Sequence, residues 1–366
     1  IDFTVMNLVL LGEYNGYSND SDSDGIINPG EDVILEFTMN NMSSDVSAYD
    51  VMGYLSTDSN VIDFPEGGIE FGDLSPNENS ALEFIQISIP DIISLGAIPV
   101  NLRIEAFYEQ EDTSEMLEYR SESSFNINVS LNQEGFPHDI DFPVNSSPLL
   151  LDVDEDGQDE IIFGDDDGFI RAFKSNGIEL INSIYPYETG DKIWGAPACA
   201  DIDLDGVDDF VLGSKDKALY LFDQNNFKGS INLGSYLMGT PAIGNIDNDE
   251  ELEIIIGGYS SGSGREIYAL NHDLTHVDGF PVLVNEKIQK GVSLADFNGN
   301  GKDDIVFGTD NDNIYLMLDN GEIAPGFPFE TGGAIKSSPT ILEISGQLII
   351  FASSTDGVLY AINPDG

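Results

Sequence analysis

The chain has 366 residues, of which 67 are acidic and 13 are basic, so its formal net charge at pH 7 is −54. Because the phosphates of nucleic acids and of anionic membranes repel so negative a surface, we expect no nucleic-acid partner and no binding to an anionic membrane surface. No stretch approaches the length of a membrane span, so we expect no membrane insertion. The single cysteine, Cys199, excludes an internal disulfide, and the apolar run around it predicts a small, buried thiol.

Residues 1–130 contain short segments that alternate apolar and polar residues, such as VILEFTMNN, ALEFIQISI and FNINVS, separated by turn residues. This alternation is typical of strands with one buried face, and the number of segments favours an immunoglobulin-like (Ig-like) β-sandwich. The chain begins with Ile1 rather than Met, so we expect a processed product or a piece of a longer chain.

The most specific feature of this region is the stretch NDSDSDGIINPGE, residues 19–31. Counted from Asp20, oxygen-bearing side chains stand at positions 1, 3, 5, 9 and 12, with a glycine at position 6, which is the spacing of an EF-hand calcium loop. No amphipathic helix flanks it, so we expect a calcium loop between two strands. The candidate ligands are Asp20, Asp22, Asp24, the carbonyl of Ile26, Asn28 and a bidentate Glu31. The longer stretch SDSDGIINPGEDVILEFTMNN, residues 21–41, resembles adhesion-type Ig modules that follow catalytic domains in secreted bacterial proteins, and the resemblance extends over residues 1–130.

Residues 131–366 are built from a repeat of nearly constant length. Pro148, Pro197, Pro241, Val292 and Pro339 mark equivalent positions of five units and lie 49, 44, 51 and 47 residues apart. Each unit has short apolar segments and no helical periodicity, which is typical of a β-propeller blade with four strands. The predicted fold class is therefore all-β, an N-terminal Ig-like β-sandwich (1–130) followed by a β-propeller (131–366) of about five four-stranded blades. We expect the first strand of each blade to be buried on both faces.

The two ends of the repeat region predict how the ring closes. The last unit stops at NPDG, residues 363–366, before a fourth strand, whereas GFPHDIDF, residues 135–142, precedes the first unit without a partner. Pairing these segments would close a ring of five blades and leave no exposed sheet edge. The alternative is that further blades lie outside this chain.

Four of the five units carry an acidic loop after the first apolar segment, as in DIDLDGVDD, residues 201–209. Oxygen-bearing side chains occupy positions 1, 3, 5 and 9, and a glycine at position 6 supplies the positive φ that a wrapped loop needs. Because the neighbouring carboxylates repel one another, such loops favour Ca²⁺, which takes about 6–8 oxygen ligands. Together with the loop at 19–31, they predict about four or five Ca²⁺ ions.

The four loops differ in charge and therefore in expected affinity. In the third loop Glu250 replaces the glycine, and in the fourth loop only two of the ligand positions, Asp296 and Asp304, carry a charge. We therefore expect the first two loops to bind most tightly and the fourth most weakly. The fifth unit has the short EISGQL, residues 343–348, and we expect no ion there. The candidate ligands, with the seventh residue of each loop offering its backbone carbonyl, are Asp152, Asp154, Asp156, Gln158 and Glu160; Asp201, Asp203, Asp205, Val207 and Asp209; Asn245, Asp247, Asp249, Glu251 and Glu253; and Asp296, Asn298, Asn300, Lys302 and Asp304.

The combination of SSPLLLDVDEDGQDE, the following DG turns and GFP at 135–137, 279–281 and 326–328 resembles the FG-GAP/VCBS repeat family over residues 135–366. Its best-known members are the propellers of integrin α-subunits, and the arrangement here is most similar to the bacterial secreted branch. The resemblance implies calcium loops between the first and second strands of each blade, on the face opposite the one that usually meets partners. It also implies ions that stiffen the propeller and do no chemistry.

Three isolated features lie outside these patterns. We expect Trp194 to be a core residue, with a sugar-binding role as the alternative. The acidic runs at 165–167 and 310–312 are predicted to be solvated strand turns, and His138, His272 and His276 fall outside any motif.

The sequence carries no catalytic constellation, because it has no GxSxG, HExxH or phosphate-binding loop and calcium explains the regular carboxylates. We therefore expect a non-enzymatic, calcium-stabilised binding or adhesion region of an extracellular or cell-surface bacterial protein, monomeric as a fragment, with a protein or glycan ligand. One alternative is a set of accessory domains of a secreted protease or polysaccharide-degrading enzyme whose catalytic domain lies outside this chain. The other is a propeller that is itself an enzyme, such as a polysaccharide lyase.

Overall fold

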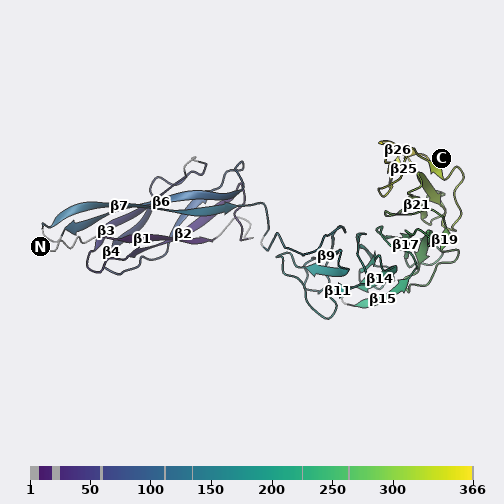
Figure 1. Cartoon of the computed structure of the whole chain (residues 1–366), viewed down its shortest axis with the longest axis horizontal. Helices are drawn as coiled ribbons and strands as arrows, with labels where there is room; N and C mark the ends of the chain where they lie inside the picture. Colours follow the sequence, from purple (N-terminus) through teal and green to yellow (C-terminus); the bar gives the residue numbers. More distant parts are fainter. Residues whose placement is uncertain are drawn as a thin grey trace. The chain divides into compact units, whose positions relative to one another are not determined.

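The computed structural model describes residues 8–18, 25–57, 61–110, 113–133, 135–224, 226–262 and 264–364. In these residues every regular element is a β-strand, which confirms the all-β prediction (Figure 1). The strands belong to two compact units, Ile1–Pro137 and His138–Gly366. None of the described residues belongs to an apolar helix long enough to cross a lipid bilayer.

The described part of the first unit forms two antiparallel sheets. Its strands are β1 (Leu10–Ser18), β2 (Asp32–Asn41), β3 (Ala48–Ser56), β4 (Ile69–Leu74), β5 (Glu83–Ser88), β6 (Gly96–Gln110) and β7 (Glu115–Val129). One sheet has the order β1-β2-β5 and the other the order β4-β3-β6-β7. Buried residues of both sheets belong to one apolar cluster, so the two sheets share a core.

Alternation along β2 explains how this core forms. Leu35, Phe37 and Met39 are fully buried while the residues between them are half-buried, because successive side chains of a strand point to opposite faces. Each such side chain stabilises the fold by about 2 kcal/mol through removal from water. The sheets approach closely at Gly12 of β1, where a Cβ would lie only 2.7 Å from the side chain of Leu102 on β6.

The described part of the second unit forms five antiparallel sheets that follow one another along the chain. Its strands are β8 (Leu149–Leu151), β9 (Glu160–Gly164), β10 (Phe169–Phe173), β11 (Tyr187–Glu188), β12 (Ala198–Ala200), β13 (Asp209–Gly213), β14 (Ala218–Asp223), β15 (Phe227–Asn232), β16 (Ala242–Gly244), β17 (Glu253–Gly257), β18 (Glu266–Leu270), β19 (Val282–Leu283), β20 (Ser293–Ala295), β21 (Asp304–Gly308), β22 (Asn313–Met317), β23 (Phe329–Glu330), β24 (Thr340–Ile344), β25 (Gln347–Ser353) and β26 (Leu359–Ile362). The first four sheets are four-stranded meanders, β8–β11, β12–β15, β16–β19 and β20–β23. The fifth sheet, β24–β26, has three strands.

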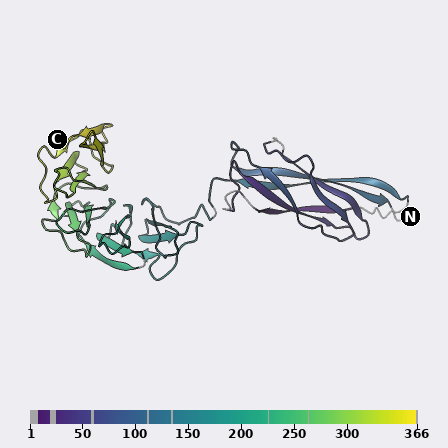
Figure 2. The same cartoon turned by 180° about the vertical axis from the view of Figure 1, so that it is seen from behind.

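Neighbouring sheets of this unit pack face to face in an arc (Figures 1 and 2). Their first strands lie side by side, β12 against β16, β16 against β20 and β20 against β24. A separate apolar cluster fills each of the four spaces between successive sheets. On β13, Phe210 and Leu212 enter the cluster shared with the first sheet, whereas Val211 enters the cluster shared with the third sheet.

A glycine at the end of each of four second strands lets the next sheet approach. A Cβ at Gly164 would lie 2.1 Å from the side chain of Ile193, and a Cβ at Gly308 would lie 2.1 Å from that of Ile335. Ile193 and Ile335 are buried and precede the first strand of the following sheet. These glycines are therefore required by packing between sheets.

The predicted burial of the first strands is wrong. All residues of the second strands β13, β17 and β21 are buried, whereas β12 is at most half-buried. The reason is that β12 pairs only with β13 and leaves its other edge open. Cys199, in the middle of β12, is exposed, so the prediction of a buried thiol is also wrong.

The predicted closing strand at 135–142 does not form. Asp141 has a φ of 65°, and its N–H donates to the side chain of Asp139 at 2.9 Å, which bends the backbone away from an extended conformation. The ring of His138 contacts that of Phe173 in β10, with centroids 4.7 Å apart, so this segment lies against the first sheet. The described residues of the last sheet pair as three strands without it, and the predicted closure is wrong.

Candidate metal sites

Four of the five sheets of the second unit carry an acidic loop between their first and second strands. Loop one spans residues 152–160, loop two 201–209, loop three 245–253 and loop four 296–304. In the fifth sheet, β24 and β25 are joined instead by the tight turn Ser345–Gly346, in which both residues have a positive φ. Because all four loops join a first strand to a second strand, they lie at the same end of their sheets.

The ninth residue closes each loop with a buried carboxylate. One oxygen of this carboxylate accepts the backbone N–H of the second loop residue, at 2.9, 3.3, 2.7 and 3.0 Å in loops one to four. This hydrogen bond fixes the loop to the start of the second strand. The four carboxylates, each at most 1% exposed, are those of Glu160, Asp209, Glu253 and Asp304.

In loops one, two and four the sixth residue is a glycine with a positive φ, as predicted. The φ values of Gly157, Gly206 and Gly301 are 88°, 90° and 86°. A residue without a Cβ adopts this conformation with little strain. Each glycine N–H donates to one carboxylate oxygen of the first loop residue, at 2.9, 3.0 and 2.8 Å. The bend therefore holds the first carboxylate against the loop backbone.

Loop three has Glu250 at its sixth position and bends differently, because Glu250 has no positive φ. The side-chain amide of Asn245 donates to the carbonyl of Asp249 at 2.9 Å, and the N–H of Asp249 donates to Asp247 at 3.0 Å. Although the glycine is missing, Asp247 and Asp249 still lie close to Glu253.

The fifth and seventh positions are linked within the loops. In loops one, two and four the N–H of the seventh residue donates to the side chain of the fifth, at 2.9 Å in each case. The predicted use of the seventh carbonyl as a ligand stays a prediction. The residues concerned are Gln158 with Asp156, Val207 with Asp205 and Lys302 with Asn300, and Glu251 holds the seventh position of loop three.

Carboxylates converge in the first three loops. In each loop a set of three carboxylates offers ligand oxygens that all lie within 4.8 Å of one another. A Ca²⁺ ion binds oxygen at about 2.3–2.6 Å, so two ligands on opposite sides of it are separated by about 5 Å. Each set can therefore hold one ion. The sets are Asp152, Asp154 and Glu160; Asp201, Asp203 and Asp205; and Asp247, Asp249 and Glu253.

Loops one and two contain buried oxygens without a protein partner. Oδ1 of Asp152, Oδ1 of Asp201 and Oδ1 of Asp203 are shielded from solvent and accept no hydrogen bond. A buried carboxylate oxygen without a partner is unfavourable, and a cation relieves it. The residues of these two loops therefore fit a bound Ca²⁺ ion better than they fit an empty loop.

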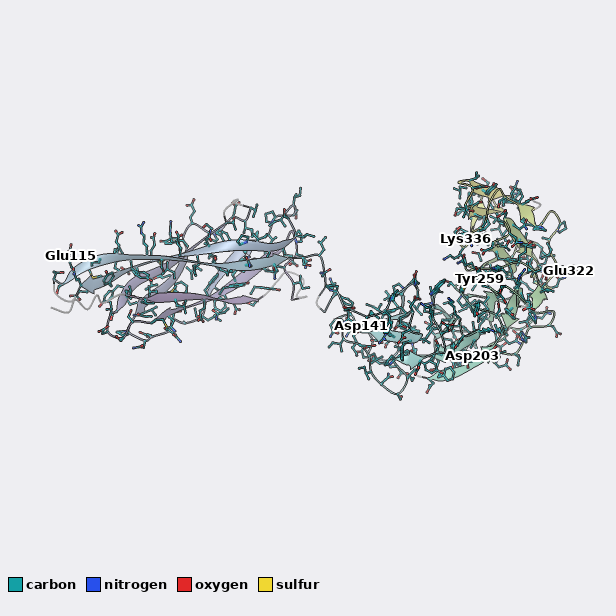
Figure 3. The ribbon with its side chains drawn as sticks, viewed as in Figure 1. Glu115, Asp141, Asp203, Tyr259, Glu322 and Lys336 are labelled. Carbon is teal, nitrogen blue, oxygen red and sulfur yellow. The ribbon has the colours of Figure 1, made fainter. Side chains whose placement is uncertain are left out.

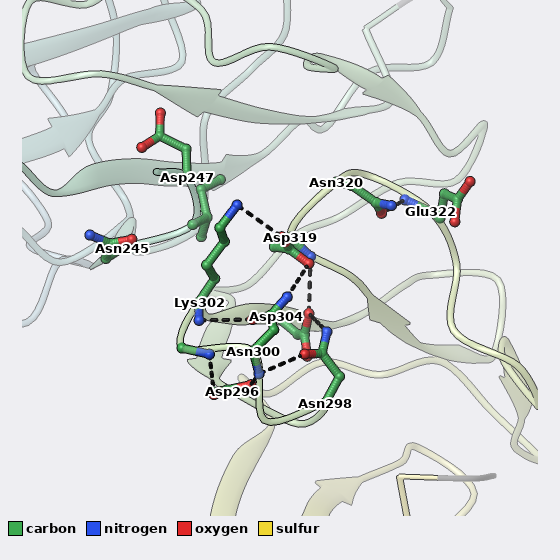
Figure 4. A network of polar contacts seen from close by, with 12 residues as sticks. Asn245, Asp247, Asp296, Asn298, Asn300, Lys302, Asp304, Asp319, Asn320 and Glu322 are labelled. Atoms are coloured by element: carbon green, nitrogen blue, oxygen red, sulfur yellow. Dashed lines mark hydrogen bonds and ion pairs between the residues drawn. The ribbon is translucent and has the colours of Figure 1, made fainter. Parts of the chain in front are cut away.

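In loop four, hydrogen bonds from protein groups satisfy the carboxylates of Asp296 and Asp304 (Figure 4). The N–H of Gly301 donates to Oδ2 of Asp296, and this bond lowers the pKa of Asp296. Oδ1 of Asp304 accepts the N–H of Asp319 at 3.0 Å and the side-chain amide of Asn298 at 3.3 Å. Loop four thus has less need of an ion than loops one and two, and its weaker binding stays a prediction.

Burial changes the proton affinity of the ninth-position carboxylates. It raises the pKa of Glu253 to about 7, and the charges of Asp247 and Asp249 add to the effect. Burial also raises the pKa of Glu160 and of Asp209. A bound cation favours the charged form of a carboxylate, so protons and metal compete at these positions.

Two lysines that the sequence patterns did not single out reach into loops one and two. Nζ of Lys174 lies 2.7 Å from Asp154 and 2.8 Å from Asp156. Nζ of Lys228 lies 2.7 Å from Asp203 and 2.9 Å from Asp209. Two signals in the sequence could have revealed them. Lysines are scarce in so acidic a chain, and these two lie at the end of one predicted strand and within another.

The loop at 19–31 in the first unit is described only in part. Ile26, Asn28 and Glu31 lie in described residues, and Glu31 is buried. Glu31 accepts the N–H of Asn28 at 2.8 Å, and the amide of Asn28 donates to the carbonyl of Ile26 at 3.3 Å. The predicted ligands that lie outside the described residues are Asp20, Asp22 and Asp24.

The opposite ends of the sheets carry aromatic and basic side chains. Trp194 is half-buried rather than a core residue, since its indole N–H donates to Asp166 at 2.8 Å and Nζ of Lys215 lies 4.1 Å from its ring centroid. Lys287 lies 5.1 Å from the ring of Tyr259. Figure 3 shows Tyr259 toward the inner side of the arc of sheets.

The acidic run at 165–167 is not a solvated turn as expected. Asp165 is fully buried, and its carboxylate accepts the side-chain Nε–H of Arg171 at 2.8 Å. It also accepts the backbone N–H groups of Asp167 and Phe169. Asp165 therefore holds the turn between β9 and β10 by a buried ion pair.

No protein-family model and no curated protein matches this chain. One similar solved structure is BBS1N in complex with ARL6DN, with a TM-score of 0.43, 8% identity, and coverage of 88% of this chain and 94% of that chain. A protein of unknown function from Bacteroides caccae has a TM-score of 0.34, 12% identity, and coverage of 72% and 87%. The V. cholerae biofilm matrix protein Bap1 has a TM-score of 0.31, 21% identity, and coverage of 50% and 39%. TM-scores this low do not establish a common fold.

Proposed function

We propose that this chain is a non-catalytic, calcium-stabilised binding or adhesion region of an extracellular protein. The observation that carries the proposal is the convergence of unpartnered carboxylate oxygens at equivalent positions of loops one and two. Extracellular calcium modules bind with dissociation constants of about 10⁻⁴–10⁻³ M, so such sites fill outside the cell. A role for the ions in stiffening the fold explains carboxylates that have no catalytic partner beside them.

The architecture we propose is a β-propeller of the FG-GAP/VCBS type preceded by an Ig-like β-sandwich. Three features of the second unit support the propeller: the sequence repeat coincides with the sheets, four sheets are four-stranded meanders, and their first strands lie side by side. The shared core of the two sheets in the first unit supports the sandwich.

The ligand we propose is a protein or a glycan that binds at the ends of the sheets opposite the acidic loops. Trp194, Tyr236 and Tyr259 lie there and offer aromatic faces, and the lysines beside them offer cations. Aromatic faces bind both sugar rings and protein side chains. The ions at the other ends of the strands would keep this surface in one arrangement.

A binding assay with the full chain tests the proposal. The immobilised chain is probed with a glycan array and a panel of extracellular matrix proteins, in millimolar Ca²⁺ and in EGTA. We expect binding to weaken in EGTA and to weaken in a Tyr236→Ser variant. The control is Phe227→Ser, which should bind like the wild type. Both residues are 39% exposed, but only Tyr236 lies on the proposed surface. Binding that is indifferent to EGTA would count against the proposal.

A further inference from the structure

Lys174 and Lys228 each place an ammonium group among predicted calcium ligands, and they come from different strands of their sheets. Lys174 directly follows β10, the third strand of its sheet, whereas Lys228 lies on β15, the fourth strand of its sheet. The two lysines are therefore not equivalent positions of the repeat. Both nevertheless contact the carboxylate at the third position of their loop, Asp154 at 2.7 Å and Asp203 at 2.7 Å.

An ammonium at these distances occupies the space that a metal ion needs. The second contact of Lys174 is the fifth-position carboxylate of Asp156, and that of Lys228 is the ninth-position carboxylate of Asp209. These are ligands that a bound ion would use, and two like charges repel strongly at such short range. An ion can therefore enter the loop only when the lysine leaves it.

Both lysines are free to leave. Their side chains are 32% and 24% exposed, and a lysine has a long flexible stem that carries its charge to water. In the absence of metal the same contacts neutralise carboxylates that would otherwise repel one another. The hydrogen bonds to Asp154 and Asp156 raise the pKa of Lys174, so its ammonium stays charged in the loop.

We propose that Lys174 and Lys228 are internal counter-cations that fill loops one and two in the metal-free protein and are displaced when a divalent cation binds. This inference rests on the proposed function, in which the loops bind calcium. The lysines stabilise the metal-free form and lower the apparent affinity of their loops. If a lysine occupies its loop for about nine-tenths of the time, the apparent affinity for calcium falls about tenfold.

The other two loops show the contrast. Among the described residues no lysine or arginine forms an ion pair with a carboxylate of loop three, although Lys302 lines the same pocket as Asp247 and Asp249. In loop four Lys302 pairs with Asp319 at 3.5 Å and not with a carboxylate of its own loop (Figure 4). The charge count alone therefore overstates the affinity of loops one and two relative to loop three.

The test is a calorimetric titration of the full chain with CaCl₂ after removal of metal, together with thermal unfolding in EGTA. Lys174→Met and Lys228→Met are compared with the matched control Lys336→Met, because Lys336 pairs with Asp310, which lies outside the four acidic loops. We expect each of the first two variants to raise the affinity of one site about tenfold and to lower Tm in EGTA, while the control changes neither. Lys228→Arg, which keeps the cation, should retain the lower affinity of the wild type.

The two possible failures are distinguishable. If the wild type binds calcium but Lys174→Met and Lys228→Met bind it with unchanged or weaker affinity, the lysines do not compete and the inference is overturned while the proposed function stands. If the wild type releases no heat with CaCl₂ and keeps its Tm, both are overturned. Should a methionine variant unfold in EGTA, the corresponding glutamine variant is titrated in its place and must meet the same expectation.

Discussion

Replacing Gly308 by alanine should loosen the contact between the fourth and fifth sheets. A Cβ at this position would lie 2.1 Å from Cγ2 and 2.5 Å from Cβ of Ile335, a side chain that is 1% exposed. Neither distance is possible between carbon atoms, so the backbone or Ile335 must move. Overpacking of this kind costs about 1–3 kcal/mol of unfolding free energy. In a unit of this size each kcal/mol lowers Tm by about 2–4 °C.

The assay is thermal unfolding of the full chain followed by the fluorescence of Trp194, its only tryptophan. Gly262→Ala is the matched control, because nothing lies within 4 Å of a Cβ there and its φ is not positive. Since Gly308 and Ile335 are in contact, G308A/I335A should lose less stability than the sum of the two single variants. A G308A variant as stable as the wild type, or strictly additive losses, would refute the reasoning.

Two further predictions concern buried charge. Arg171→Met should lower the free energy of unfolding by about 3–5 kcal/mol in urea titrations, because it leaves the buried carboxylate of Asp165 without its cation. The double variant D165N/R171M should recover part of this loss. If R171M unfolds with the same free energy as the wild type, the ion pair does not have this role. In EGTA, the free energy of unfolding should fall as the pH rises from about 4.5 to about 7. The reason is that burial raises the pKa of Glu253 to about 7 in the folded protein, whereas the unfolded chain releases this proton at lower pH. Calorimetric scans across this range should show a weaker fall for Glu253→Gln, and an equal fall would exclude Glu253 as its source.

The repeated features were predictable from the sequence because each one depends on neighbouring residues. Alternation in VILEFTM predicts which side chains of β2 are buried, and the spacing of Asp201, Asp203 and Asp205 around Gly206 predicts a wrapped loop with converging oxygens. The tight turn at Ser345–Gly346 likewise follows from the shortened EISGQL. In each case the local pattern and the fold favour the same conformation.

The features that were missed depend on contacts between segments far apart in the chain. Lys228 lies 25 residues from Asp203, and no local pattern indicates that the two side chains meet. Cys199 is exposed because β12 is an edge strand, which its apolar sequence does not reveal. The bend at Asp141 depends on the side chain of Asp139 competing for a backbone N–H that an extended strand would use.

The most direct test of the calcium sites is the Tm of the full chain in millimolar Ca²⁺ compared with its Tm in EGTA. At a calcium concentration one hundredfold above the dissociation constant, each filled site stabilises the fold by about 2.7 kcal/mol. We therefore predict a clearly higher Tm in calcium, and a smaller difference for Asp152→Asn and Asp201→Asn but not for the control Glu343→Gln in the sheet that lacks an acidic loop. Equal values of Tm in calcium and in EGTA would contradict the claim that these carboxylates coordinate a divalent ion.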